Sequence, residues 1–209
     1  TGLASKLIGG IVALSGGIPI IGMLLTMVCC IILGMGVPTT ANYCIMATTC
    51  APILEQLGIP RVAAHFFVFY FGIVADITPP VALAAYAGSA IAKGNPMKTG
   101  INATKLAIAA FIVPYIFALD PSMLFVNTEV IDVITICISA VIGIFGVATS
   151  MNGFLFKKII WPFRILFAIG GLTLLIPGIV TDIIGLVLVG GLSAYQYVTR
   201  GKGDSLPPV

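Results

Sequence analysis

Charged positions are sparse along this chain, and the gaps between them define its elements. The stretch from Leu7 to Leu54 contains no charged residue, and it is more than twice as long as the roughly 20 residues that one helix needs to cross the hydrocarbon core of a bilayer. Glycines and a proline at residues 34–40 interrupt it, because both residue types oppose helix formation. The pattern therefore predicts a helical hairpin at about 18–56, with arms at about 18–33 and 41–55.

The rest of the chain contains further apolar segments. The segment at about 62–92 is interrupted by Asp76-Ile77-Thr78-Pro79-Pro80, which predicts one membrane span that is broken in its middle. The remaining predicted helices lie at about 101–119, 130–150, 159–176 and 178–198. The last two fit either two short tilted spans or a re-entrant loop, because length alone does not distinguish these arrangements.

The composition places the chain in a membrane. Of its 209 residues, 59% are hydrophobic and 8% are charged, and the mean hydropathy is +1.18. Soluble domains carry roughly 25% charged residues, because their surfaces must be wetted. The net charge of +3 comes from scattered residues that form no basic stripe. These values exclude a cytosolic enzyme and a nucleic-acid-binding module, and they predict an all-α polytopic protein whose main partner is the lipid bilayer.

The distribution of charges predicts an orientation and a set of surface anchors. Short loops rich in Lys and Arg stay on the cytoplasmic side, which here would hold Lys93, Lys98, Lys105, Lys157, Lys158 and Arg164. The loop with Asp120, Glu129 and Asp132 would then face outward. Glu55, Arg61 and His65 lie near the ends of predicted spans, and we expect them to be interfacial residues rather than metal ligands.

The first break carries groups that suit a cation. Gly34 and Gly36 allow the chain to leave helical geometry, and Pro38 removes a backbone donor. A helix is interrupted at membrane depth only where protein or a water-filled cavity satisfies the backbone. Oxygen atoms without a fixed charge suit an alkali cation, and the next side chains supply them: Thr39, Thr40 and Asn42. The threonine hydroxyls are also expected to cap the second arm, whose amino end would attract an anion.

The second break repeats this scheme. Thr78 is a candidate cap, Pro79 and Pro80 are expected to start the next half-helix, and Asp76 precedes them. Paired broken helices near the bilayer midplane are typical of secondary transporters, and an ionisable residue inside a span is a candidate functional residue. The structural alternatives are that each break is a simple kink, and that Asp76 only caps the next half-helix or pairs with His65. A continuous helix would place that histidine about 16 Å away.

Both breaks lie in a series of segments whose residues and order along the chain resemble those of a known family. The segments are Gly34-Met35-Gly36-Val37-Pro38-Thr39-Thr40-Ala41-Asn42-Tyr43, then Ala51-Pro52-Ile53-Leu54 with Leu57-Gly58-Ile59-Pro60, and then Ile73-Val74-Ala75-Asp76-Ile77-Thr78-Pro79-Pro80-Val81-Ala82. In order and spacing they resemble the large membrane subunit of tripartite ATP-independent periplasmic (TRAP) transporters. The resemblance is closest to the branch in which the small and large subunits are fused and the soluble receptor is of the TAXI type.

The resemblance also implies a division of the chain. It covers roughly residues 1–125, which would be the carboxy-terminal half of the subunit's transport core. Residues 126–209 would be a branch-specific transmembrane extension with a short soluble tail. The implied fold contains discontinuous helices and a re-entrant helical hairpin, and it forms half of an inverted-repeat, elevator-type secondary transporter in the inner membrane.

The implied function is sodium-driven import of an organic acid that a periplasmic binding protein delivers. The implied partners are a TAXI-type binding protein and the remaining amino-terminal half of the permease, with its fused small-subunit part. Sodium is the coupling ion, and no cofactor is expected. The residues carried over as cation or substrate ligands are Gly34, Gly36, Pro38, Thr39, Thr40, Asn42, Asp76, Thr78, Pro79 and Pro80. Those expected at sodium itself are Gly34, Gly36, Thr39 and Thr78.

Other functions compete with secondary transport. An intramembrane hydrolase would need a second catalytic group at the depth of Asp76, and the next acidic residue within a predicted span is Asp182. The permease of an ATP-driven importer would need a cytoplasmic coupling loop longer than the loops expected here. A non-transporting membrane anchor would not need two polar breaks. We therefore expect a permease rather than an enzyme, and the ATP-driven permease and the anchor are the alternatives.

Overall fold

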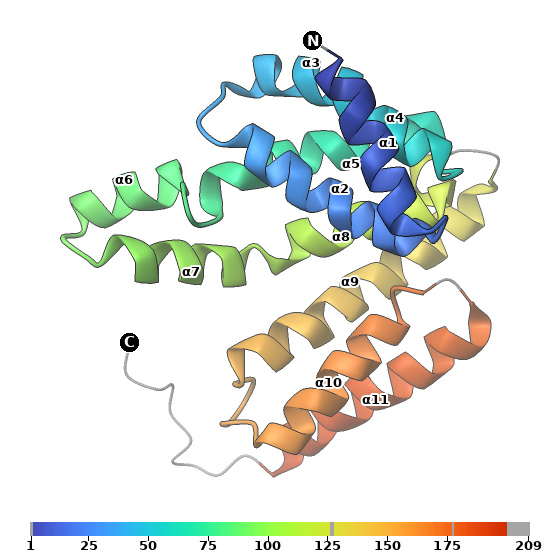
Figure 1. Cartoon of the computed structure of the whole chain (residues 1–209). Coiled ribbons are helices and arrows are strands. Elements are labelled where there is room, and N and C mark those ends of the chain that lie inside the picture. The colour runs from blue at the N-terminus through green and yellow to red at the C-terminus, as the bar shows by residue number, and fades with distance from the viewer. Residues whose placement is uncertain (1, 126–127, 177, 200–209) are drawn as a thin grey trace. The chain divides into compact units, whose positions relative to one another are not determined.

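The computed structural model describes residues 2–125, 128–176 and 178–199 (Figure 1). Every regular element in these ranges is a helix, apart from an isolated β-bridge between Phe154 and Lys158. The prediction of an all-α fold is therefore confirmed. The chain divides into two compact units, Thr1–Leu124 and Phe125–Val209. We call them unit 1 and unit 2 and describe each by itself.

Unit 1 contains most of the helices. They are α1 (Leu3–Ser15), α2 (Pro19–Gly34), α3 (Thr39–Thr49), α4 (Ala51–Gln56), α5 (Arg61–Val74), η1 (Ala75–Ile77), α6 (Leu83–Ile91), α7 (Pro96–Leu106), α8 (Ile108–Leu119) and η2 (Pro121–Leu124). Helix α1 was not predicted, although it is separated from α2 by a recognisable break at Gly16 and Gly17. Both glycines have positive φ, 58° and 76°, a backbone conformation that glycine adopts without steric cost.

The predicted hairpin differs from the structure in its second arm. Helix α2 ends at Gly34, close to the expected boundary, but the arm expected at 41–55 consists of α3 and α4. Cys50 separates these two helices, and Pro52 lies in the first turn of α4. A proline is tolerated there because the first amides of a helix have no intrahelical acceptor. The same residue inside a continuous helix would remove a hydrogen bond.

Helix α5 forms the centre of unit 1 and packs against α2, α3, α4 and α8. The rings of Phe67 and Phe71 are fully buried and lie 4.7 Å apart between centroids. Tyr115 of α8 packs edge-on against both rings, at 5.2 and 5.8 Å. Edge-to-face packing of this kind stabilises buried aromatic clusters beyond the simple burial of area. Phe66, in contrast, is 44% exposed, so α5 has one buried face and one outer face.

The segment at 101–119, expected as one helix, contains a break in the structure. The structure contains α7 and α8 instead, which meet at Ala107 with a bend of 40°. Helix α7 begins earlier than expected, because the Asn95 side chain accepts a hydrogen bond of 3.0 Å from the Lys98 amide and Pro96 occupies the first turn. Asparagine at the cap followed by proline is a strong start signal for a helix. Helices α6 and α7 lie side by side as an antiparallel pair (Figure 1).

Unit 2 consists of α9 (Val130–Asn152), α10 (Trp161–Thr173) and α11 (Ile179–Val198), with α10 packed against both of the others. Helices α9 and α11 are long and apolar enough to cross a membrane. Among the described residues the bent pair α7–α8 is a third candidate span if it is counted as one. Helix α10 has 13 residues and is shorter than a full span, which needs about 17–25 residues.

Glycines allow the helices of unit 2 to approach closely. A Cβ atom at Gly171 would lie 2.6 Å from the Gly143 carbonyl oxygen, and one at Gly185 would lie 2.7 Å from the Gly170 carbonyl oxygen. Small residues at such positions are typical of helix packing in membranes, where close van der Waals contact replaces the hydrophobic effect. The backbones of α9, α10 and α11 are therefore in near contact.

Arg164 connects the ends of α9 and α10. Its Nε donates to the Ser150 carbonyl oxygen at 2.8 Å, and its Nη2 donates to the Met151 carbonyl oxygen at 2.9 Å. The Ser150 hydroxyl donates in return to the Arg164 carbonyl oxygen at 2.6 Å. The last carbonyl groups of a helix lack intrahelical donors, and a cation at this end also opposes the helix dipole. Arg164, predicted as a topological anchor, thus also caps α9.

We expect Gly171→Val to lower the free energy of unfolding of unit 2 by about 1–3 kcal/mol, because the larger side chain forces α9 and α10 apart. Gly190→Val in α11 is the matched control, since a Cβ atom at Gly190 meets nothing within 4 Å. Thermal unfolding in detergent measures the difference, by circular dichroism and by the fluorescence of Trp161, the only tryptophan in the sequence. Equal unfolding temperatures for the two variants would contradict the close packing.

Candidate functional site at the two helix breaks

The first break, which we call the hairpin tip, comprises residues 34–42. Helix α2 ends at Gly34, Gly36 has a φ of 73°, and α3 starts directly after Pro38. The prediction that threonine hydroxyls cap α3 is wrong, because no side chain accepts a hydrogen bond at this cap. Thr39 and Thr40 lie instead within the first turn and are exposed. The first amides of α3 therefore receive no cap from the threonines.

The second break, which we call the α5 break, comprises residues 75–82. Helix α5 continues into η1, and the Thr78 hydroxyl donates to the Val74 carbonyl oxygen at 2.7 Å. Thr78 thus completes the end of α5 rather than capping α6, which corrects the prediction. Pro79 and Pro80 are joined by a cis peptide bond and lie in a turn, and α6 begins only at Leu83. Threonine hydroxyls often bond to the carbonyl four residues back in this way.

Ala82 connects the turn to α6 in a strained conformation. Its φ is 34° and its ψ is 48°, and it is fully buried. A non-glycine residue in the left-handed region costs about 1–2 kcal/mol, so surrounding contacts must fix it. The Ala82 amide donates to the Thr78 carbonyl oxygen at 3.1 Å, and its own carbonyl accepts from the Tyr86 amide at 2.9 Å.

Helix α7 supports the α5 break from one side. The Thr104 hydroxyl lies 3.2 Å from the Ile77 carbonyl oxygen. Gly100 lies directly against the turn, since a Cβ atom there would be 3.1 Å from Pro79 Cγ. The Tyr86 hydroxyl donates to the Pro80 carbonyl oxygen at 2.8 Å. The carbonyl groups freed by the interrupted helix are therefore partly satisfied by neighbouring side chains, as a break at membrane depth requires.

Asn42 joins the hairpin tip to α5. Its Nδ2 donates to the Gly72 carbonyl oxygen at 3.0 Å, and the residue is only 3% exposed. Glycines make this approach possible: a Cβ atom at Gly34 would lie 2.9 Å from the Gly72 carbonyl oxygen, and one at Gly72 would lie 2.9 Å from Asn42 Nδ2. The Asn42 Oδ1 atom is buried without a hydrogen-bond donor in the described part of the chain. An uncharged oxygen atom therefore remains available at the junction.

The structure brings some of the predicted site residues together and leaves others apart. Gly34 and Asn42 lie against the end of α5, where a Cβ atom at Gly34 would be 3.0 Å from Ala75 Cβ. Asp76 follows Ala75 and is half-buried, and its carboxylate makes no hydrogen bond or ion pair among the described residues. The remaining predicted residues of the tip are exposed: Gly36, Pro38, Thr39 and Thr40.

The donor set favours a cation held by uncharged oxygen atoms. Residues 2–125, 128–176 and 178–199 contain no group of three or more His, Cys, Asp or Glu side chains that is arranged to hold a metal ion. The buried Asn42 Oδ1 lies at the junction, and the Thr78 hydroxyl and backbone carbonyl groups lie at the α5 break. Such ligands suit an alkali cation better than a transition metal, which prefers imidazole and thiolate groups.

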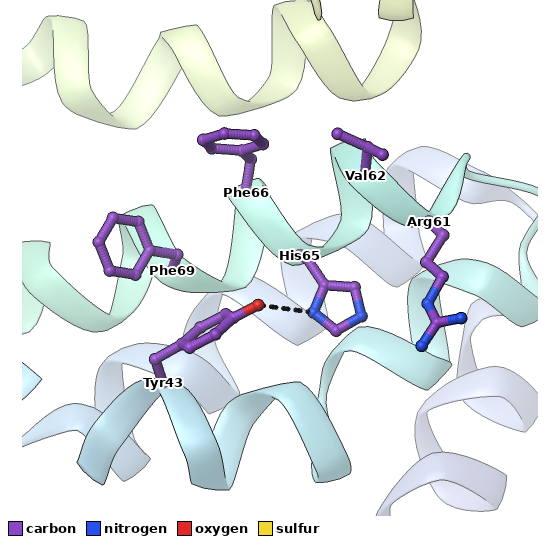
Figure 2. A pocket seen from close by; sticks show the side chains of 6 residues that line it. All are labelled: Tyr43, Arg61, Val62, His65, Phe66 and Phe69. Atoms are coloured by element: carbon purple, nitrogen blue, oxygen red, sulfur yellow. Dashed lines mark hydrogen bonds between the residues drawn. The ribbon is translucent and has the colours of Figure 1, made fainter. Parts of the chain in front are cut away.

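A separate groove lies on the outer face of α5. It has a volume of about 540 Å³, and we call it the α5 groove; its lining residues are Tyr43, Arg61, Val62, His65, Phe66 and Phe69. The Tyr43 hydroxyl and His65 Nδ1 are 3.0 Å apart (Figure 2). Glu55 Oε1 lies 3.5 Å from His65 Nε2 and 3.8 Å from Arg61 Nε.

The prediction of separate interfacial residues at Glu55, Arg61 and His65 did not include this arrangement. The spacing of Arg61 and His65, four residues apart, places them on the same face of a helix, which was the available signal. The contact with Tyr43 had no local signal, because it joins two helices. His65 therefore has Tyr43 and Glu55 as partners rather than Asp76.

Comparison with known proteins assigns the part of the chain that holds both breaks to a protein family. Residues 1–131 match the family described as the tripartite ATP-independent periplasmic transporter, DctM component. No curated protein and no solved structure matches the chain. The matched range includes the hairpin tip, the α5 break and the α5 groove, and it covers more than half of the sequence. The chain belongs to this family and is thus a membrane component of a TRAP transporter.

Proposed function

We propose that the chain is part of the permease of a sodium-coupled secondary transporter that imports an organic acid. The observation that carries this proposal is the junction at Asn42, where the hairpin tip is joined by one buried hydrogen bond to the last turns of α5, just before the α5 break. The two interrupted elements, the hairpin and α5, are in contact there. They provide helix ends, carbonyl groups and hydroxyl groups near one another. This combination is what a transporter uses to hold an ion and a substrate inside a bilayer.

Sodium is proposed as the coupling ion because the available ligands are uncharged oxygen atoms. The proposed ligands are oxygen atoms of Gly34, Gly36, Thr39 and Thr78. Thr78 already orients its hydroxyl group towards the last turn of α5. The Asn42 Oδ1 atom is proposed as a further ligand, because a buried polar atom without a partner is costly and a cation would satisfy it.

The substrate carboxylate is proposed to lie at the amino end of α3. No side chain caps this end, so its first amides carry a partial positive charge that favours an anion. Pro38, Thr39 and Thr40 surround the end of the helix, and Asp76, Pro79 and Pro80 would form the facing wall. Sodium binding would order the tip and the α5 break, so that the two breaks move as one body with their cargo.

The complete system is proposed to contain further parts. A periplasmic binding protein of the TAXI type would deliver the organic acid. The other half of an inverted-repeat, elevator-type permease, with a fused small-subunit part, would complete the transport core. Residues 126–209 would be a branch-specific transmembrane extension, and the assembly would lie in the inner membrane. The resemblance of the two helix breaks to TRAP permeases supports each of these proposals.

We expect Thr78→Val and Thr39→Val to raise the sodium concentration for half-maximal uptake roughly fivefold, which is about 1 kcal/mol. Each change removes one hydroxyl oxygen with little change in shape. The measurement is uptake by the assembled permease and its binding protein in vesicles, over a series of sodium concentrations with a non-coupling cation as replacement.

The matched control for this prediction is Thr99→Val. Thr99 also donates to the carbonyl four residues back, that of Asn95, but it lies in α7. If Thr78→Val and Thr39→Val both show the sodium dependence of the unmodified protein, the proposed sodium ligands are wrong.

We expect Asn42→Leu to reduce uptake at least roughly tenfold while the protein still reaches the membrane. The substitution conserves shape but leaves the Gly72 carbonyl oxygen buried without a donor, which costs about 1–3 kcal/mol. Asn102→Leu, at an exposed position of α7, is the control and is expected to transport normally. Normal uptake by Asn42→Leu, at equal abundance in the membrane, would show that the junction is not needed for transport.

A further inference from the structure

The α5 groove is mainly apolar and lies on a surface that faces away from the core of unit 1. Val62 and Phe66 are 49% and 44% exposed, and Phe69 extends the apolar wall. The volume of about 540 Å³ falls within the range of small-molecule sites, roughly 300–1,000 Å³. Neither helix break borders this groove, so the proposed transport mechanism does not use it.

The lining of the groove changes from polar to apolar along α5. Arg61 is the first residue of the helix, and Phe69 lies eight residues further on, which corresponds to about 12 Å along the axis. In a bilayer, charged residues at helix ends lie at the level of the headgroups, whereas phenylalanines deeper in the span face hydrocarbon. One end of the groove thus suits a polar headgroup, and the remaining wall suits an acyl chain.

At the polar end Arg61 lines the groove, and Glu55 lies next to Arg61 and His65, beside the lining residues. Glu55 Oε1 lies 3.8 Å from Arg61 Nε, and the Arg61 side chain is 81% exposed, which leaves most of its guanidinium accessible. His65 lies between two polar partners, with the Tyr43 hydroxyl 3.0 Å from Nδ1 and Glu55 Oε1 3.5 Å from Nε2. Arg61 and His65 thus both lie close to the same Glu55 carboxylate oxygen.

We propose that the α5 groove binds a zwitterionic phospholipid with a primary ammonium group, of the phosphatidylethanolamine type. The phosphate pairs with the Arg61 guanidinium, and the ammonium group donates hydrogen bonds to Glu55. One acyl chain lies along Val62, Phe66 and Phe69. A pair of opposite charges matches a headgroup that also carries both signs, and hydrogen bonds between charged groups are the strongest of their kind.

The same geometry discriminates against other headgroups. An anionic phosphatidylglycerol would pair with Arg61 but would place no cation next to Glu55. A phosphatidylcholine carries the second charge as a quaternary ammonium, which has no proton to donate to the carboxylate. The preference for a primary ammonium therefore depends on Glu55, whereas attraction of the phosphate depends on Arg61.

Native mass spectrometry of the full chain in detergent tests this inference. The protein is equilibrated with equal amounts of phosphatidylethanolamine, phosphatidylglycerol and phosphatidylcholine that carry identical acyl chains. We expect phosphatidylethanolamine to be retained roughly tenfold more than either competitor. Glu55→Gln is expected to abolish the preference over phosphatidylcholine, and Arg61→Gln to weaken retention of all three lipids. Lys105→Gln, which removes an exposed cation from α7, is the control and is expected to change nothing.

A second variant separates occupancy of the groove from general lipid adhesion. Val62→Trp fills the groove and is expected to prevent specific retention, while circular dichroism shows the helical content of the unmodified protein. Equal retention of the three lipids, a preference for phosphatidylglycerol, or an unchanged preference in Glu55→Gln would each overturn the proposal. So would a dimer that disappears in Val62→Trp, because the groove would then be an interface between copies. Displacement of lipid by an organic acid alone would identify it as a substrate site and would also overturn the proposal.

Discussion

The hydrogen bond from Asn42 to the Gly72 carbonyl oxygen attaches the hairpin tip to α5, just before the α5 break begins. Interrupted helices leave backbone groups without partners, and in a bilayer no water is available to satisfy them. The bond forms only because Gly34 and Gly72 have no side chains at the point of contact. A buried amide between two glycines thus holds the hairpin tip against α5, and the candidate cation and substrate site depends on this contact.

A second hydrogen bond strengthens the attachment of α3 to α5. Tyr43, the neighbour of Asn42, reaches His65, so consecutive residues of α3 bind two positions of α5 that are seven residues apart. Helix α5 therefore has a double role, since one end borders the α5 break and the other borders the α5 groove. Movement of the hairpin relative to α5 would require the loss of both bonds, which favours motion of the two elements together.

The sequence predicted the features that depend on local chemistry. Gaps between charges located α2 and α9, and the glycines and prolines located both breaks, because these residues act on the backbone where they stand. The predictions that were wrong or missing concern features that depend on competing local hydrogen bonds or on contacts between residues distant in the sequence. Thr78 bonds backwards to Val74 instead of capping α6. The pairing of Asn42 with Gly72 joins residues 30 positions apart and had no signal in the sequence.

The backbone conformation of Ala82 restricts which residues can occupy this position. Glycine would adopt its φ of 34° without strain, yet the chain places a methyl group there. That methyl group fills space beside α7, where a Cβ atom at Gly100 would lie 3.4 Å from Ala82 Cβ. The same Cβ atom would lie 3.1 Å from Pro79 Cγ and 3.3 Å from Tyr86 Cε1, so a side chain at position 100 would press on the turn as well as on Ala82. Position 82 is fully buried in a left-handed conformation and borders Gly100, so it leaves room for alanine or glycine but not for a larger side chain.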